Sequence, residues 1–133
     1  MPKQKDKLSD KNIKKFKVAE KFEIGDLKIN PFSIPHDAAN PCGFNVSNGK
    51  KKISIATDIG NMSKDILKNL EESEFILLES NYDLEVLRHS PYPYKLKCRI
   101  ASPTGHLSNE MAGKTISYLA KNRIKESYAW TFE

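Results

Sequence analysis

The chain has 133 residues, a mass of 15.1 kDa and 38% hydrophobic residues, which suit one domain over residues 1–133 with a modest core. No apolar run approaches the roughly 20 residues of a membrane span, and the lysine-rich start lacks the apolar centre of a signal peptide. We therefore expect a cytoplasmic protein without membrane association. The formal charge of +5 arises mostly in residues 1–28, where nine lysines face five acids. Basic termini are commonly solvated surface, so this charge alone does not establish nucleic-acid binding.

The first half of the chain predicts antiparallel strands. Between residues 13 and 29 apolar side chains nearly alternate, with breaks at Gly25-Asp26 and Asn30-Pro31, which predict a turn and a bulge. Two further β-rich runs lie on either side of Asn48-Gly49, a strong hairpin signal.

The second half predicts helices and one buried strand. Ser63 and Ser108 can each cap a helix, and the apolar run "FILLE" at residues 75–79 is typical of a buried strand. The expected order is two strand pairs, a helix, a strand and two helices, which is a mixed α/β arrangement. The isolated Cys42 and Cys98 lack C-x-x-C and zinc-finger spacing, so we expect reduced thiols packed in the fold.

Four ionisable residues fall where strands end or helices begin. Asp58 and Glu79 each end a strand, His36 follows Ile34-Pro35, and His106 precedes the last helix. Sites in open α/β sheets form at such ends, so the four groups could converge on one rim. The alternative for each is structural, because an aspartate after a strand is often a turn residue and a lone histidine is often at the surface.

Three segments resemble successive parts of the metallo-β-lactamase-fold hydrolases. They are "FEIGDLKINPFSIPHDAANPCGF", "KKISIATDIG" and "FILLESNYDLEVLRHSPYPYKLKCRIASPTGHLSNE", and the resemblance runs from about Asn12 to about Asn122. It is strongest to the bacterial YycJ/VicX type, which is related to tRNA 3′-processing endonucleases. The resemblance implies an α/β (α+β) chain that forms roughly the later half of an αββα sandwich.

The resemblance also implies roles for these residues. His36 matches the histidine that binds the first metal ion, and Asp58 matches the carboxylate that bridges two ions, either Zn²⁺ or Mn²⁺. Glu79 and His106 resemble the Glu-His pair of the tRNA-processing relatives, in which the histidine acts at the scissile phosphate and the glutamate orients its ring. On this basis we interpret His106 as a catalytic acid or phosphate contact and not as a metal ligand.

The sequence also departs from the family pattern. It contains no His-x-His-x-Asp-His cluster, and no histidine follows His106. Only His36 and Asp58 remain of about seven family ligands, whereas a zinc site ordinarily has at least three protein ligands. We therefore expect the chain to be a fragment of a longer hydrolase.

A tyrosine-rich and lysine-rich stretch bears on the substrate. "SPYPYKLKCR" places Tyr92 and Tyr94 beside Lys95, Lys97 and Arg99, a combination suited to stacking on bases and neutralising phosphates. The alternative is a proline-shaped loop whose tyrosines pack on the core. His89 matches no family position and is expected at the surface.

Three functional hypotheses follow. The chain is part of a metal-dependent phosphodiesterase, exonuclease-like, that acts on nucleic acid. Alternatively it is a non-catalytic half-domain that binds nucleic acid or complements another chain carrying the missing ligands, or it is a nonfunctional truncated remnant.

Overall fold

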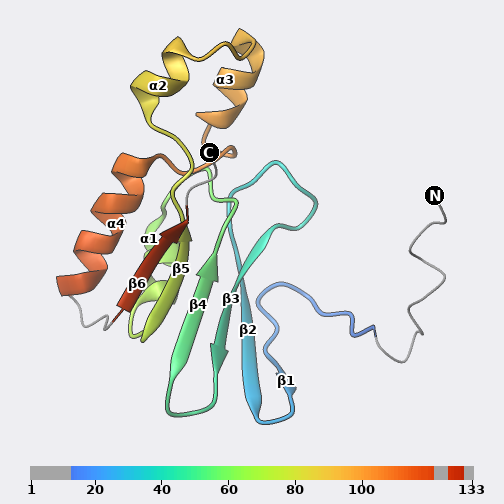
Figure 1. The fold of residues 1–133 in the computed structure, drawn as a ribbon. Helices are drawn as coiled ribbons and strands as arrows, with labels where there is room; N and C mark the ends of the chain where they lie inside the picture. Colours follow the sequence, from blue (N-terminus) through green and yellow to red (C-terminus); the bar gives the residue numbers. More distant parts are fainter. Residues whose placement is uncertain (1–12, 122–125, 131–133) are drawn as a thin grey trace, which may run out of the picture.

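One mixed sheet forms the centre of the computed structural model, which describes residues 13–121 and 126–130. Within these residues, the six strands lie in sequence order from β1 to β6, and four helices accompany the sheet (Figure 1). The elements are β1 (Phe22–Ile24), β2 (Leu27–Ser33), β3 (Cys42–Ser47), β4 (Lys52–Ala56), α1 (Lys64–Leu70), β5 (Phe75–Glu79), α2 (Leu84–His89), α3 (Tyr94–Ile100), α4 (Asn109–Lys121) and β6 (Glu126–Trp130).

The predicted turn at Gly25-Asp26 is confirmed, but the predicted break at Asn30-Pro31 is wrong. Strand β2 continues to Ser33, and Pro31 pairs in register with Phe44 of β3. The Pro31 carbonyl accepts a hydrogen bond from the Ala19 amide at 3.0 Å, so the position that lacks an N–H faces away from β3. The ladder therefore loses no hydrogen bond at this proline. Residues 13–18, expected to alternate as strand, have no regular structure.

The Asn48-Gly49 hairpin is confirmed with a longer loop than two residues. Strands β3 and β4 are antiparallel, and the Asn48 side chain accepts from the amides of Lys50 and Lys51 at 3.0 and 2.8 Å. Gly49 has a φ of +87°, a conformation that favours glycine. After β4 the strand pairing changes from antiparallel to parallel. Strands β4, β5 and β6 are parallel, and α1 forms the crossover from β4 to β5.

Capping side chains set where the helices begin. Ser63 Oγ accepts from the Ile66 amide at the start of α1, and Ser108 Oγ accepts from the Met111 amide at the start of α4, as predicted. Asp83 caps α2 in the same way, through the amides of Glu85 and Val86. Three helices follow β5 where two were expected, and the chain adds the strand β6.

Helices α1 and α4 cover one face of the sheet and build the core with it. Apolar side chains of both helices pack on strand residues that point to that face, as expected for layers of an α/β fold. The buried core residues are Phe32, Ile34, Ala56, Ile59, Ile66, Leu70, Ile76, Leu78, Leu107, Ala112 and Leu119.

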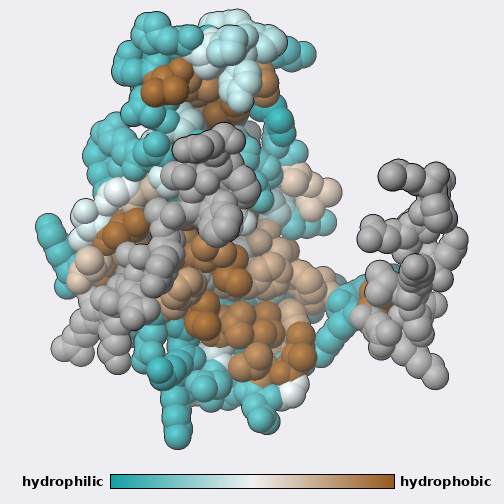
Figure 2. Space-filling model, in the orientation of Figure 1, coloured by the Kyte–Doolittle hydropathy of each residue, from teal (hydrophilic) through white to brown (hydrophobic). Residues whose placement is uncertain are grey.

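The opposite face of the sheet carries a row of apolar side chains that no described helix covers. Phe44 pairs with Ile55, which pairs with Leu77. Ile53 lies two residues before Ile55 on β4, on the same face of the sheet, and is 42% exposed. Figure 2 shows hydrophobic atoms gathered over the strands on this face. Phe16 contacts its edge, with a ring centroid 5.6 Å from that of Phe44.

The fold class is therefore α/β, as predicted. The helix layer and one sheet correspond to half of the expected αββα sandwich. No helix among the residues that the structure describes combines the length and apolar character needed to cross a membrane. Both cysteines are free, but only Cys42 is partly buried; Cys98 is exposed, so its predicted packing inside the fold is wrong.

Candidate functional site

Three loops and the end of β5 meet at one edge of the sheet. The loops follow β2 (residues 34–41), follow β4 (residues 57–63) and connect α3 to α4 (residues 101–108). Gly60 allows the second and third loops to approach, because a Cβ there would lie 2.3 Å from the Pro103 carbonyl oxygen. Gly105 lets the third loop fold back on the end of α3, because a Cβ there would lie 2.1 Å from the Arg99 carbonyl oxygen. Backbone bonds join the same loops, from Gly60 N to Pro35 O and from Asp37 N to Thr104 O.

His36 is fixed by a backbone carbonyl. Its Nδ1 lies 2.9 Å from Gly105 O, and a carbonyl can only accept, so Nδ1 carries the proton in this contact. In the neutral ring this leaves the lone pair on Nε2, which lies 4.0 Å from Asp58 Oδ1. The His36 side chain is 13% exposed, so its ring is held in place while Nε2 faces the carboxylate.

Asp58 stands at the tip of the loop after β4 with its carboxylate open to solvent. Its φ of +58° lies in the left-handed region, which aspartate tolerates better than most residues. The amides of Asp58 and Ile59 both donate to the Glu79 carboxylate, at 3.2 and 2.9 Å. Because those bonds hold the turn, the Asp58 side chain, 58% exposed, is available for a ligand.

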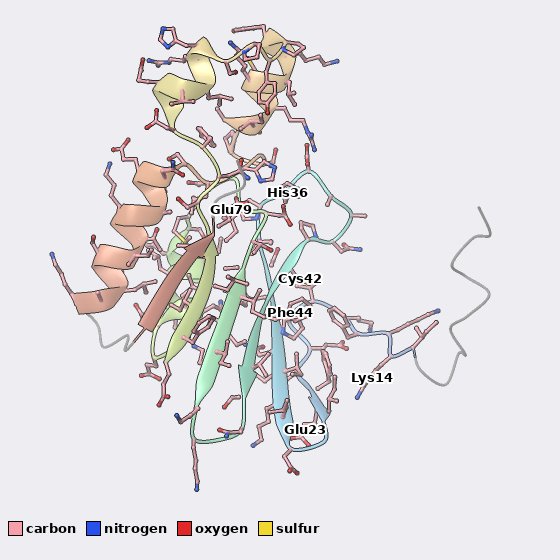
Figure 3. The ribbon with its side chains drawn as sticks, in the orientation of Figure 1. Lys14, Glu23, His36, Cys42, Phe44 and Glu79 are labelled. Atoms are coloured by element: carbon pink, nitrogen blue, oxygen red, sulfur yellow. The ribbon has the colours of Figure 1, made fainter. Side chains whose placement is uncertain are left out.

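Glu79 is a buried carboxylate that organises this edge. Oε1 accepts from the amides of Ile59 and Leu107 at 2.9 and 2.7 Å, and Oε2 accepts from the Asp58 amide and contacts His106 Nδ1 at 3.0 Å. The side chain is only 3% exposed, and Figure 3 shows Glu79 beside His36 at the upper end of the sheet. Glu79 thus holds the ring of His106 and the turn of Asp58 in one arrangement.

His36, Asp58 and His106 form one cluster. Each offers a ligand atom, and the three atoms lie within 4.8 Å of one another. The rings of His36 and His106 have centroids 5.2 Å apart, and His106 Nδ1 lies 3.9 Å from Asp58 Oδ1. The predicted convergence of these residues and the predicted Glu79–His106 contact are therefore confirmed, while the roles assigned to the four residues stay predictions.

Two imidazoles and a carboxylate are donors that suit Zn²⁺ and Mn²⁺. The engagement of both Nδ1 atoms leaves Nε2 as the remaining donor on each ring. The residues present therefore fit a divalent ion, and three protein groups would leave further coordination positions open.

An ion pair beside the cluster was not predicted from the sequence. Arg99 of α3 donates to Asp37 through Nε at 2.5 Å and through a terminal nitrogen at 3.0 Å, and Asp37 Oδ1 lies 3.5 Å from His36 Nε2. The hydrogen bond from Arg99 lowers the pKa of the Asp37 carboxyl below its ordinary value. The adjacency of Asp37 to His36 was visible in the sequence, but its pairing with a residue 62 positions away was not.

The remaining residues singled out in the sequence lie outside the cluster. His89 is exposed at the end of α2, as predicted, with Nδ1 2.8 Å from Glu85 O. Tyr92 and Tyr94 are 52% and 83% exposed, so the alternative in which they pack on the core is wrong. The segment is also not a simple loop, because α3 begins at Tyr94.

Comparison with known proteins identifies sequence relatives. Residues 2–125 match the family model described as the beta-lactamase superfamily domain. The chain is 32% identical over 113 residues to exodeoxyribonuclease YycJ of Bacillus anthracis and 34% identical over 120 residues to exodeoxyribonuclease WalJ of Streptococcus pneumoniae. These alignments cover 85% and 90% of this chain but 43% and 44% of the relatives, so the chain spans less than half of their length.

Solved structures show the same fold. Zn²⁺-bound PqqB from Methylobacterium extorquens superposes with a TM-score of 0.63 at 20% identity, covering 84% of this chain and 42% of that one. The short form of human tRNase Z gives 0.57 at 19% identity, covering 81% and 36%. The resemblance inferred from the sequence motifs is thus confirmed, and the chain belongs to the β-lactamase superfamily domain family, with a partial metallo-β-lactamase fold.

Proposed function

We propose that this chain contributes the His36, Asp58 and His106 side of a divalent-metal centre that cleaves phosphodiester bonds in nucleic acid. The observation that carries the proposal is the cluster of three ligand groups at one edge of the sheet, with Glu79 buried behind it. The names of the relatives, both exodeoxyribonucleases, support DNA as the substrate.

His36 and Asp58 are assigned to metal binding. Nε2 of His36 and the open carboxylate of Asp58 face each other at 4.0 Å, and both are ligand types for Zn²⁺ and Mn²⁺. When bound, a divalent ion supplies Lewis-acid activation of water and of the phosphoryl group. Further ligands must come from polypeptide other than these 133 residues, because the sequence holds no His-x-His-x-Asp-His cluster.

His106 is assigned to the leaving oxygen. Its Nδ1–H donates to Glu79, so a proton on Nε2 can pass to the oxygen that departs from phosphorus while Glu79 stabilises the imidazolium. The specific alternative is that His106 is a third metal ligand, since its ligand atom lies within the same 4.8 Å cluster. Either role uses the same ring orientation, and ion binding by His106 variants separates them.

A second candidate function is complementation without catalysis by this chain alone. The uncovered apolar row of Phe44, Ile53, Ile55 and Leu77 favours it, because such a sheet face is ordinarily buried against another layer. In this alternative another polypeptide supplies the covering layer and the missing ligands.

The test is reconstitution of cleavage. The 133-residue chain alone is expected not to cleave single- or double-stranded DNA with Mn²⁺ or Zn²⁺, because its ligand set is incomplete. Fusion to an upstream segment bearing His-x-His-x-Asp-His and a downstream segment bearing a ligand histidine should produce cleavage of a labelled strand. Asp58→Ala should abolish that cleavage, whereas the exposed Asp65→Ala in α1 should retain it. Cleavage that survives Asp58→Ala would refute the assigned site.

A further inference from the structure

Helices α2 and α3 form a projecting arm next to the cluster. Figure 1 shows the two helices standing clear of the sheet at the end where β4 and β5 terminate. Lys97 Nζ donates to Arg88 O at 2.6 Å, which joins the two helices, and Leu87 of α2 is buried. A groove of about 480 Å³ lies along the arm, and we call it the arm groove. Its main lining residues are Leu84, Leu87, Arg88, Tyr92, Tyr94 and Lys97.

The arm groove combines aromatic, apolar and cationic side chains without an acidic one. Tyr92 and Tyr94, on either side of Pro93, are 52% and 83% exposed, and their rings are available for stacking. Arg88 and Lys97 add positive charge to the same groove. Among the described residues around it, Glu85 pairs with Arg88 at 2.6 Å but does not line the groove. A nucleobase stacks on such rings, and its phosphate is attracted to such cations.

Hydrogen bonds join the base of the arm to the cluster. Ile100, the last residue of α3, accepts from the His106 amide at 2.9 Å, and Arg99 holds Asp37 next to His36. Ala101, the first residue of the loop that carries His106, also lines the arm groove, so one end of the groove lies at this loop. The volume of the groove also falls within the range of small-ligand sites.

We infer that the arm groove binds a nucleotide of single-stranded nucleic acid and guides the strand to the His36, Asp58 and His106 cluster. This inference rests on the proposed function for the identity of the ligand. The cations without a lining carboxylate favour an anionic ligand over a neutral protein segment, and the two exposed tyrosine rings favour nucleic acid over an acidic peptide, because a base can stack on them.

The test measures binding of a fluorescein-labelled oligothymidylate to the 133-residue chain by fluorescence anisotropy in EDTA. Tyr94→Ala should raise Kd about 5- to 150-fold, because loss of one stacking platform has an effect of that order. Tyr118→Ala is the matched control, since Tyr118 is 47% exposed but lies on α4. Lys97→Gln should reduce the slope of log affinity against log salt by about 0.7 to 1, as expected for one phosphate contact on a single strand.

Three results would overturn the inference. They are an absence of oligonucleotide binding by the wild-type chain, an unchanged Kd in Tyr94→Ala, and an equal loss in Tyr118→Ala. A groove that is instead covered by polypeptide would give the second result. Thermal melts of each variant, followed by circular dichroism, identify a change in Kd that comes from unfolding, and Tyr94→Phe, which keeps the ring, should retain wild-type affinity.

The outcomes also separate this inference from the proposed function, because binding in EDTA requires neither an ion nor cleavage. Weaker binding by Tyr94→Ala, together with a reconstituted protein that does not cleave, would count against the proposed function alone. Cleavage that depends on Asp58, together with unchanged binding by Tyr94→Ala, would overturn the arm groove alone.

Discussion

His106 Nδ1 lies 3.0 Å from Oε2 of Glu79, a carboxylate that is almost completely buried. The same carboxylate accepts hydrogen bonds from the backbone amides of Asp58, Ile59 and Leu107. One side chain therefore joins the loop after β4 to the loop before α4. The sequence predicted this contact because Glu79 ends a strand and His106 precedes a helix at the same edge of the sheet, and a family resemblance gave the pair its proposed role. The structure adds that Glu79 is also the support of the turn that presents Asp58.

Replacing Glu79 by Gln should destabilise the fold. Each oxygen of the Glu79 carboxylate accepts two hydrogen bonds. In the glutamine variant, the side-chain NH₂ would take the place of one oxygen, and the two N–H groups that face it would lose their acceptor. We expect the free energy of unfolding to fall by about 1–3 kcal/mol, the usual effect of leaving buried polar groups unpaired. Urea denaturation measures this loss, and the exposed Glu85→Gln serves as a control. Equal stability of Glu79→Gln and wild type would show that the carboxylate does not support the two loops.

A methyl group at Gly60 should separate the loops that form the site. Its Cβ would lie 2.3 Å from Pro103 O and 2.5 Å from Gly105 N, so the backbone must move. Gly60→Ala should lower the free energy of unfolding by about 1–3 kcal/mol, the typical effect of overpacking. Gly113→Ala is the matched control, because nothing lies within 4 Å of its Cβ and alanine in α4 should stabilise by about 0.5–1 kcal/mol. Destabilisation by both variants alike would contradict the close approach.

Local signals in the sequence were sufficient for several elements. Ser63 and Ser108 marked helix starts because their hydroxyls satisfy free amides, and Asn48-Gly49 marked a hairpin because the turn accommodates glycine with positive φ. The apolar run at residues 75–79 was identified as a buried strand because both faces of β5 carry apolar side chains.

Elements that depend on distant partners were missed. Pro31 suggested a break, and only its carbonyl bond to Ala19 on the side away from β3 explains why β2 continues. Strand β6 is defined by its parallel pairing with β5, across about 50 residues of chain, which no local pattern reveals. The Arg99–Asp37 pair joins residues 62 positions apart. The positions of His36, Asp58, Glu79 and His106 at element ends were predictable, whereas their mutual distances depend on this tertiary arrangement.

Variants of the two cluster histidines should distinguish their roles. His36→Ala should weaken Co²⁺ binding by the chain, because it removes an assigned ligand. His106→Ala should leave Co²⁺ binding nearly unchanged and lower the cleavage rate of the reconstituted protein by about 10²- to 10⁴-fold, the usual contribution of a general acid. Visible absorption of Co²⁺ reports the first effect without any cleavage. An equal loss of Co²⁺ binding in the two variants would make His106 a metal ligand.

Lys52 should make stability depend on alkaline pH. Burial lowers the pKa of its ammonium group below the ordinary 10.5, against the opposing attraction of Glu72 and Glu71. Between the lowered value and 10.5 the unfolded chain binds more protons than the folded chain, so the free energy of unfolding contributed by Lys52 rises with pH. The difference in this free energy between wild type and Lys52→Met should therefore increase as the pH rises through the lowered pKa toward 10.5. A constant or falling difference in urea denaturation would contradict this sign.

The central claim is that His36 and Asp58 are metal ligands at an incomplete centre, and the most direct measurement is a calorimetric titration of the 133-residue chain with Zn²⁺ and with Mn²⁺. We predict weak, substoichiometric binding that His36→Ala and Asp58→Ala both remove and that Asp65→Ala retains, because each of the first two variants removes a ligand while Asp65 lies away on α1. Two tightly bound ions per chain after dialysis, or binding that persists unchanged in Asp58→Ala, would contradict the claim.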